Sequence, residues 1–233
     1  MTTEHVRIPV AGKRLDGDLR LPDRPRGIVL FAHGSGSSRH SPRNQFVARV
    51  LEQRGLATLL IDLLTEQEEV VDATTGHLRF DIEMLASRLA GIIDWLRARP
   101  ETSALPIGLF GASTGGGAAL VAAAARPGEV AAIVSRGGRP DLAGPALPHV
   151  TAPTLLIIGG FDEPVIEMNR DAAARMRGPG QHVELEIVPG ATHLFEEAGT
   201  LERVSELAGD WFARYLDASS TPASGRPSTG RAG

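Results

Sequence analysis

Short, mainly apolar runs recur along the chain and are separated by longer stretches in which apolar residues repeat every three or four positions. Such runs are typical of strands that are covered on both faces, as in a parallel sheet. The sequence predicts strands of this kind at 27–32, 56–61, 105–110, 130–135, 154–159 and 183–188. Two further extended segments, 6–10 and 15–21, flank a turn at 11–14 and predict an antiparallel hairpin.

The stretches between the runs predict helices. Ser41 and Pro42 form an N-cap followed by a first-turn proline, and an apolar stripe continues from there to Leu51. Further helices are predicted at 81–99, 114–125 and 164–176, and a last one carries apolar residues from Leu201 to Tyr215. Strands that alternate with helices predict the α/β class, with a mostly parallel sheet of about eight strands and helices on both faces.

The length of 233 residues suits one α/β domain with a large core. We therefore expect a single domain over 1–216. The remaining segment, 217–233, is rich in Ser, Thr, Gly and Arg and lacks large apolar side chains, so we expect a disordered tail. The acidic stretch 66–69 predicts a solvated loop or the edge of a helix.

Charge and composition exclude several classes of function. The net charge of -4 is too small to indicate a nucleic-acid or membrane partner. The absence of cysteine excludes disulfides, a thiol nucleophile and thiolate metal sites. Residues 1–5 lack the features of a signal peptide, and no apolar run is long enough to span a membrane. We expect a soluble cytoplasmic protein, and the sequence does not indicate its oligomeric state.

The pentapeptide at 111–115, Gly-Ala-Ser-Thr-Gly, lies between a predicted strand and a predicted helix. A serine on such a sharp turn is exposed at the top of a sheet, where a neighbouring base can activate it as a nucleophile. The flanking glycines keep the turn sterically possible. Because a G-x-S-x-G match arises readily by chance in a glycine-rich chain, its position and partners decide its meaning.

Two possible partners follow other predicted strands. Asp162 follows the strand at 154–159, and His193 follows the strand at 183–188, so both belong at the same end of the sheet as Ser113. In this interpretation His193 takes the proton from Ser113, and Asp162 holds the imidazole and stabilises its cation. Alone, Asp162 would equally suit the start of a helix and His193 a loop without a role, but together with Ser113 they predict a catalytic triad.

A tetrahedral intermediate also needs backbone N–H donors for its oxyanion. The residue after the nucleophile is Thr114, and the loop at 33–36 follows an early strand. We therefore predict that the amides of Thr114 and Ser35 form the oxyanion hole. His33 is expected to brace this loop rather than to act as a base.

These segments together resemble the α/β-hydrolase superfamily. The resemblance rests on the stretch 33–44, the elbow at Ser113, the segment 159–165 and the loop with His193, and it covers about 6–216. Within the superfamily the chain is similar to the dienelactone-hydrolase-like branch, especially to small hydrolases sometimes joined to a phosphoribosyltransferase domain.

The chain departs from that branch in two ways. Dienelactone hydrolases proper use a cysteine nucleophile, whereas this chain has Ser113, and the sequence shows no phosphoribosyltransferase domain. Dienelactone itself is therefore not the expected substrate. Since some relatives carry the triad acid after the preceding strand, Asp141 remains an alternative to Asp162.

The segment 136–153, where larger relatives insert a lid, is short. We therefore expect an open pocket, a minimal lid and a short acyl or activated aryl ester as substrate. Charged residues near this end of the sheet are candidates for binding a carboxylate or phosphate on the substrate, or are solvated or internally paired. They are Arg39, His40, Arg43, Arg136 and Arg139.

The resulting prediction is a serine hydrolase that cleaves an ester, lactone or thioester of a small molecule, with no cofactor. A non-catalytic binding protein on the same scaffold, an acyltransferase and a peptidase remain alternatives. A nucleotide-binding loop at 108–115 is disfavoured, because no lysine precedes Ser113. The histidines also lack the spacing of a metal site.

Overall fold

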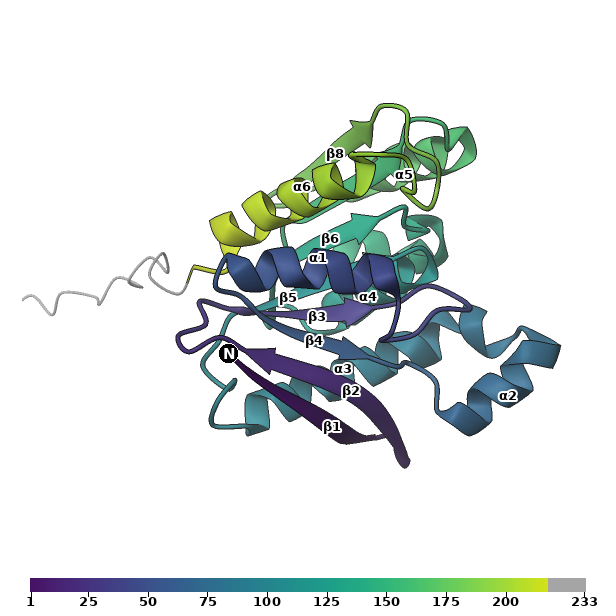
Figure 1. The fold of residues 1–233 in the computed structure, drawn as a ribbon. Helices are drawn as coiled ribbons and strands as arrows, with labels where there is room; N and C mark the ends of the chain where they lie inside the picture. The colour runs from purple at the N-terminus through teal and green to yellow at the C-terminus, as the bar shows by residue number, and fades with distance from the viewer. Residues whose placement is uncertain (218–233) are drawn as a thin grey trace, which may run out of the picture.

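The computed structural model describes residues 1–217, which form an eight-stranded sheet between two layers of helices (Figure 1). The strand order is β1-β2-β4-β3-β5-β6-β7-β8. β1 and β2 form an antiparallel hairpin, β2 pairs antiparallel with β4, and every other pair is parallel. The strands are β1 (Thr2–Val10), β2 (Lys13–Leu21), β3 (Ile28–Ala32), β4 (Ala57–Ile61), β5 (Ile107–Ala112), β6 (Val130–Arg136), β7 (Thr154–Gly159) and β8 (Val183–Val188).

The helices cover both faces of the sheet. α1 and α6 pack side by side on one face, and α3, α4 and α5 lie on the other (Figure 1). The helices are α1 (Pro42–Gln53), α2 (Glu66–Thr75), α3 (Ile82–Ala98), α4 (Thr114–Ala125), α5 (Glu163–Arg175) and α6 (Thr200–Tyr215), with 3-10 segments η1 (Leu78–Phe80) and η2 (Pro140–His149). The predicted fold class is therefore confirmed.

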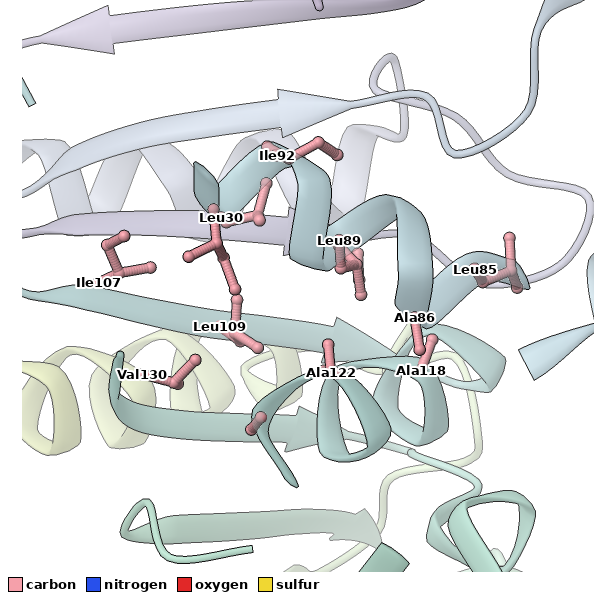
Figure 2. Close-up of a cluster of buried hydrophobic side chains, with 14 of the residues drawn as sticks. Leu30, Leu85, Ala86, Leu89, Ile92, Ile107, Leu109, Ala118, Ala122 and Val130 are labelled. Atoms are coloured by element: carbon pink, nitrogen blue, oxygen red, sulfur yellow. The ribbon is translucent and has the colours of Figure 1, made fainter. Parts of the chain in front are cut away.

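Alternation along each central strand divides the core into two layers. In β3, Leu30 points toward α3 and α4, whereas Phe31 packs with the side chains of α1 and α6. Figure 2 shows the first layer, in which Leu89 and Ile92 of α3 and Ala122 of α4 meet the strand residues. α4 consists almost entirely of Gly and Ala in this region, so its backbone lies close to the sheet. This close packing fixes the position of its first residue, which follows Ser113.

The acidic stretch 66–69, expected to be a solvated loop or the edge of a helix, is the edge of a helix. It forms the first turn of α2, where Thr65 and Glu68 make a reciprocal capping box. The Glu68 carboxylate also receives two hydrogen bonds, of 2.7 and 2.8 Å, from the buried guanidinium of Arg88 on α3. Sequence patterning missed this helix because its anchor is an ion pair between distant residues rather than an apolar stripe.

Two other expectations concern the ends of the chain and membranes. The predicted disordered tail, apart from Asp217, lies outside the described residues. Within residues 1–217, none of the helices combines the length and the apolar character that crossing a bilayer requires.

Glu68→Gln should lower the free energy of unfolding by about 3 kcal/mol, because it leaves the buried Arg88 charge uncompensated. Burial alone would raise the pKa of Glu68, but hydrogen bonds from Arg88 and Thr65 outweigh it and lower the pKa to about 2 from 4.5. The ionised form is thus favoured by folding, so this stabilisation is present above pH 4.5 and is lost as the pH falls toward 2. Denaturant unfolding at several pH values measures the effect.

Glu66→Gln is the matched control, since Glu66 is an exposed residue of the same helix. It removes the same charge without exposing a buried partner. Equal losses of stability in the two variants at neutral pH would contradict the assignment of Glu68 as the anchor of α2.

Candidate active site

Ser113 lies at the turn between β5 and α4 in a backbone conformation that serine rarely adopts, with φ 50° and ψ -122°. Glycines make this turn possible. A Cβ atom at position 115 would lie 2.2 Å from the carbonyl oxygen of Ala32, and one at position 111 would lie 2.5 Å from the Cα of Gly116. The strained serine is therefore held by close backbone packing on both sides, as a nucleophile elbow requires.

The His193 imidazole is hydrogen-bonded to Asp162, whose carboxylate oxygen Oδ2 lies 2.6 Å from Nδ1. Because an ionised carboxylate only accepts, Nδ1 carries the hydrogen and Nε2 of the neutral ring is free to accept a proton. The Asp162 side chain is 14% exposed and that of His193 is 37% exposed, so the acid is shielded while the base faces the pocket.

The alternative acid, Asp141, has a different partner. Its two carboxylate oxygens accept hydrogen bonds of 2.8 and 2.7 Å from the Arg139 guanidinium. The structure thus brings Asp162, from the end of β7, to His193 and pairs Asp141 with Arg139, the residue that precedes η2.

Ser113 and His193 line one pocket of about 220 Å³ at the carboxyl ends of the strands. This position agrees with the location of ligand sites in open α/β sheets. The other residues that line it are Gly34, Ser35, Ser37, Ser41, Arg43, Asn44, Ala112, Arg136 and Leu194. Asp162 therefore orients His193, and His193 lines the same pocket as Ser113.

The two residues predicted for the oxyanion hole contact each other. The Ser35 amide donates to the Thr114 hydroxyl, with a distance of 3.0 Å between Ser35 N and Thr114 Oγ1. Thr114 is the first residue of α4. The N–H groups in the first turn of a helix have no hydrogen-bond acceptor within the helix, so the Thr114 amide is available to a ligand. The loop after β3 is therefore fixed to the elbow, and the Ser35 amide is already engaged by a side chain of the same predicted site.

His33 braces the loop after β3 through hydrogen bonds of its ring. Its Nε2 accepts from the Leu63 amide at 3.0 Å, so Nδ1 carries the hydrogen and donates to the Gly34 carbonyl at 2.9 Å. Burial lowers the pKa of His33, and the Gly34 carbonyl and nearby acids offset this effect only in part. The neutral ring thus links the loop after β3 to the loop after β4.

The candidate anion-binding residues lie in different places. Arg39 makes ion pairs with Asp62 and Asp18, and it lines a neighbouring pocket. His40 is exposed, and Arg139 is neutralised by Asp141. None of these three is among the lining residues of the pocket that holds Ser113, whereas Arg43 and Arg136 are.

Sequence reasoning missed Asn44, which is 2% exposed and accepts a hydrogen bond of 3.0 Å from Arg136 at its Oδ1. The sequence feature that could have indicated it is its position in the first turn of α1, directly after the Ser41 cap. In the structure this turn lines the pocket that holds Ser113. In the part of the chain that the structure describes, no group of three or more His, Asp or Glu side chains could hold a metal ion.

Comparison with known proteins identifies the family of the chain. The model of the dienelactone hydrolase family matches residues 15–217. The chain is also 57% identical over 213 residues to a Mycobacterium tuberculosis protein named "Putative phosphoribosyl transferase", in strains CDC 1551 and H37Rv. The match covers 91% of this chain and 46% of each relative, so the chain spans about half the length of these curated relatives.

Solved structures place the chain in the same group. A dienelactone hydrolase from Anabaena variabilis is 60% identical, with a TM-score of 0.89 over 92% of this chain and 98% of that one. Est1E from Butyrivibrio proteoclasticus shares the fold at 17% identity, with a TM-score of 0.75 over 90% of this chain and 98% of its own. The family match over most of the chain, and its high identity to a structure of the same description, show that this chain belongs to the dienelactone hydrolase family.

Proposed function

We propose that the chain is a serine hydrolase that cleaves a carboxylic ester or a related acyl bond of a small molecule through an acyl-enzyme. The observation that carries this proposal is the hydrogen bond between Asp162 and His193, which orients an imidazole into the pocket that holds the strained Ser113. Membership of the dienelactone hydrolase family, and 60% identity to a structure described as a dienelactone hydrolase, support it.

In the first half of the reaction, Ser113 Oγ attacks the substrate carbonyl while His193 Nε2 takes the hydroxyl proton. Asp162 holds the ring in the tautomer that has Nε2 free, and its charge stabilises the imidazolium. The carbonyl oxygen becomes an oxyanion, for which we propose the Thr114 amide as one donor. The Ser35 amide serves as the second donor once it leaves the Thr114 hydroxyl that it contacts in the free protein. Collapse of the intermediate breaks the bond to the leaving group, which receives the proton from His193.

In the second half, water attacks the acyl-enzyme. His193 takes a proton from this water and returns it to Ser113 Oγ as the carboxylic acid leaves. The serine takes the place of the cysteine that dienelactone hydrolases proper use, since this chain has no cysteine. A hydroxyl is a weaker nucleophile than a thiolate, so the proposed chemistry depends more strongly on the His193 base.

The name of the M. tuberculosis relatives refers to a different reaction, transfer of a phosphoribosyl group. This chain matches less than half of those proteins but 98% of the Anabaena dienelactone hydrolase chain. We therefore assign the hydrolase activity to the region of the M. tuberculosis relatives that matches this chain.

Ser113→Ala should remove esterase activity without unfolding the protein, because the strained backbone is retained and only the hydroxyl is lost. Loss of a triad nucleophile lowers kcat on the order of a million-fold. The measurement is hydrolysis of short-chain 4-nitrophenyl esters, together with labelling by a fluorophosphonate and mapping of the adduct by mass spectrometry.

Wild-type protein should carry the adduct on Ser113, and Ser113→Ala should carry none. A folded wild-type protein that hydrolyses no ester and forms no adduct would favour a non-catalytic binding protein. Full activity of Ser113→Ala would contradict the proposed nucleophile, and product formation only with an added alcohol or amine acceptor would favour an acyltransferase.

Asp162→Asn should lower kcat on the order of ten-thousand-fold, because an amide no longer holds His193 in the required tautomer. Asp141→Asn is the matched control, since it makes the same change in an aspartate whose partner is Arg139. It should leave kcat close to that of the wild type. The opposite ranking of the two variants would identify Asp141 as the acid.

A further inference from the structure

The Arg136 side chain is buried in the candidate active site without a carboxylate partner. Its residue is 6% exposed at the end of β6, and its guanidinium donates to the neutral amide oxygen of Asn44 while Nε has no hydrogen-bond partner. No ion pair joins it to an acid among residues 1–217. Burial and the nearby Arg43 lower its pKa to about 10, so the group remains charged at neutral pH.

The other arginine buried to this degree in the described chain shows the usual arrangement. Arg88 is 4% exposed, and both of its terminal nitrogens donate to the Glu68 carboxylate. A buried charge is normally paired in this way, because removing it from water is unfavourable. Arg136 therefore bears a desolvation cost that a bound anion would offset.

A second cation and a helix terminus face the same pocket. Arg43 lies in the first turn of α1, and it pairs at 2.9 Å with Glu196, whose side chain is 62% exposed. α1 has 12 residues, and its N-terminal end contributes Ser41, Arg43 and Asn44 to the lining. The positive end of the helix dipole adds to the two guanidinium charges. The residues that line the pocket include these two arginines and neither Asp nor Glu.

This cationic region lies beside the reacting serine. Arg136 is the strand partner of Ala112 in the pairing of β5 with β6, and its carbonyl oxygen accepts the Ser113 amide at 3.2 Å. A small molecule in a pocket of about 220 Å³ would therefore meet both Ser113 and the guanidinium. The anionic group of such a molecule would be separated from the scissile carbonyl by only a few bonds.

We propose that Arg136, Arg43 and the N-terminal end of α1 form an anion subsite, and that the enzyme acts on short esters that carry a carboxylate or a phosphate. A guanidinium donates two parallel hydrogen bonds to either group. This inference names the substrate class of the proposed hydrolase and rests on that function, but the anion subsite itself does not require Ser113 to be the nucleophile.

Binding is tested by calorimetry with inorganic phosphate and with glutarate, using Ser113→Ala so that the result does not depend on turnover. Adding Arg136→Gln should weaken the binding of the preferred anion about 10- to 100-fold, as expected for the loss of charged hydrogen bonds. Stronger binding of phosphate would indicate a phosphorylated ester, and stronger binding of glutarate a carboxylate-bearing one.

Arg54→Gln is the matched control for Arg43→Gln. Both side chains are 31% exposed and pair with an exposed acid, but Arg54 lies at the opposite end of α1. Arg43→Gln should weaken anion binding, and Arg54→Gln should not. No saturable binding of either anion, or equal binding by the Arg136→Gln variant, would overturn the proposal. If Arg136→Gln does not fold, the comparison of Arg43 with Arg54 decides the question in the same way.

Kinetics provides a second test in the enzyme with Ser113 intact. The 4-nitrophenyl monoester of adipic acid and its neutral methyl ester differ only at the distal end, where one has a carboxylate and the other a methyl ester. Arg136→Gln should lower kcat/KM about 10-fold or more for the anionic ester, mainly through KM, and much less for the neutral one. An equal loss for both esters would show that Arg136 only supports the structure and would overturn the subsite.

Discussion

The backbone of Ser113 is the constraint on which the rest of the site depends. A φ of 50° is an unfavourable backbone conformation for any residue except glycine, and such strain persists only where the surrounding structure holds the residue in place. Here the surroundings are α4, which packs closely enough on β3 that a methyl group at position 115 would meet the carbonyl of Ala32. Gly34 adds a contact from the loop after β3, since a Cβ there would lie 3.0 Å from the Ser113 Cβ.

That same packing brings the other parts of the site together. The Ser113 carbonyl accepts the amides of Gly116 and Arg139, and its own amide donates to Arg136. The elbow is thus tied to the start of α4 and to the segment that follows β6. Loops from β3, β5 and β6 consequently meet around one serine, while Asp162 follows β7 and His193 follows β8 farther along the same edge of the sheet.

Local patterns predicted most of the fold and the candidates for catalysis. The apolar runs predicted the strands because a parallel sheet is covered on both faces, and the order of Ser113, Asp162 and His193 predicted their common edge. The sequence favoured Asp162 as the partner of His193 but left Asp141 open, because the choice between them depends on which loop curves toward the imidazole. Local patterns also missed α2, whose anchor joins residues separated by 20 positions.

The residues proposed to bind the substrate lie farther apart in the sequence than the residues of the nucleophile elbow do. The elbow can be seen in five consecutive residues, because strand, turn and helix must follow one another to expose the serine. The environment of Arg136 has no such signature: it depends on Asn44, 92 positions away, and on the absence of Asp and Glu from the described residues that line the pocket. Arg39 and Arg139 were equally good candidates in the sequence, yet each is neutralised by a carboxylate in the fold. The feature that separates Arg136 from them is a buried charge that no carboxylate among residues 1–217 pairs with, and only the folded chain reveals it.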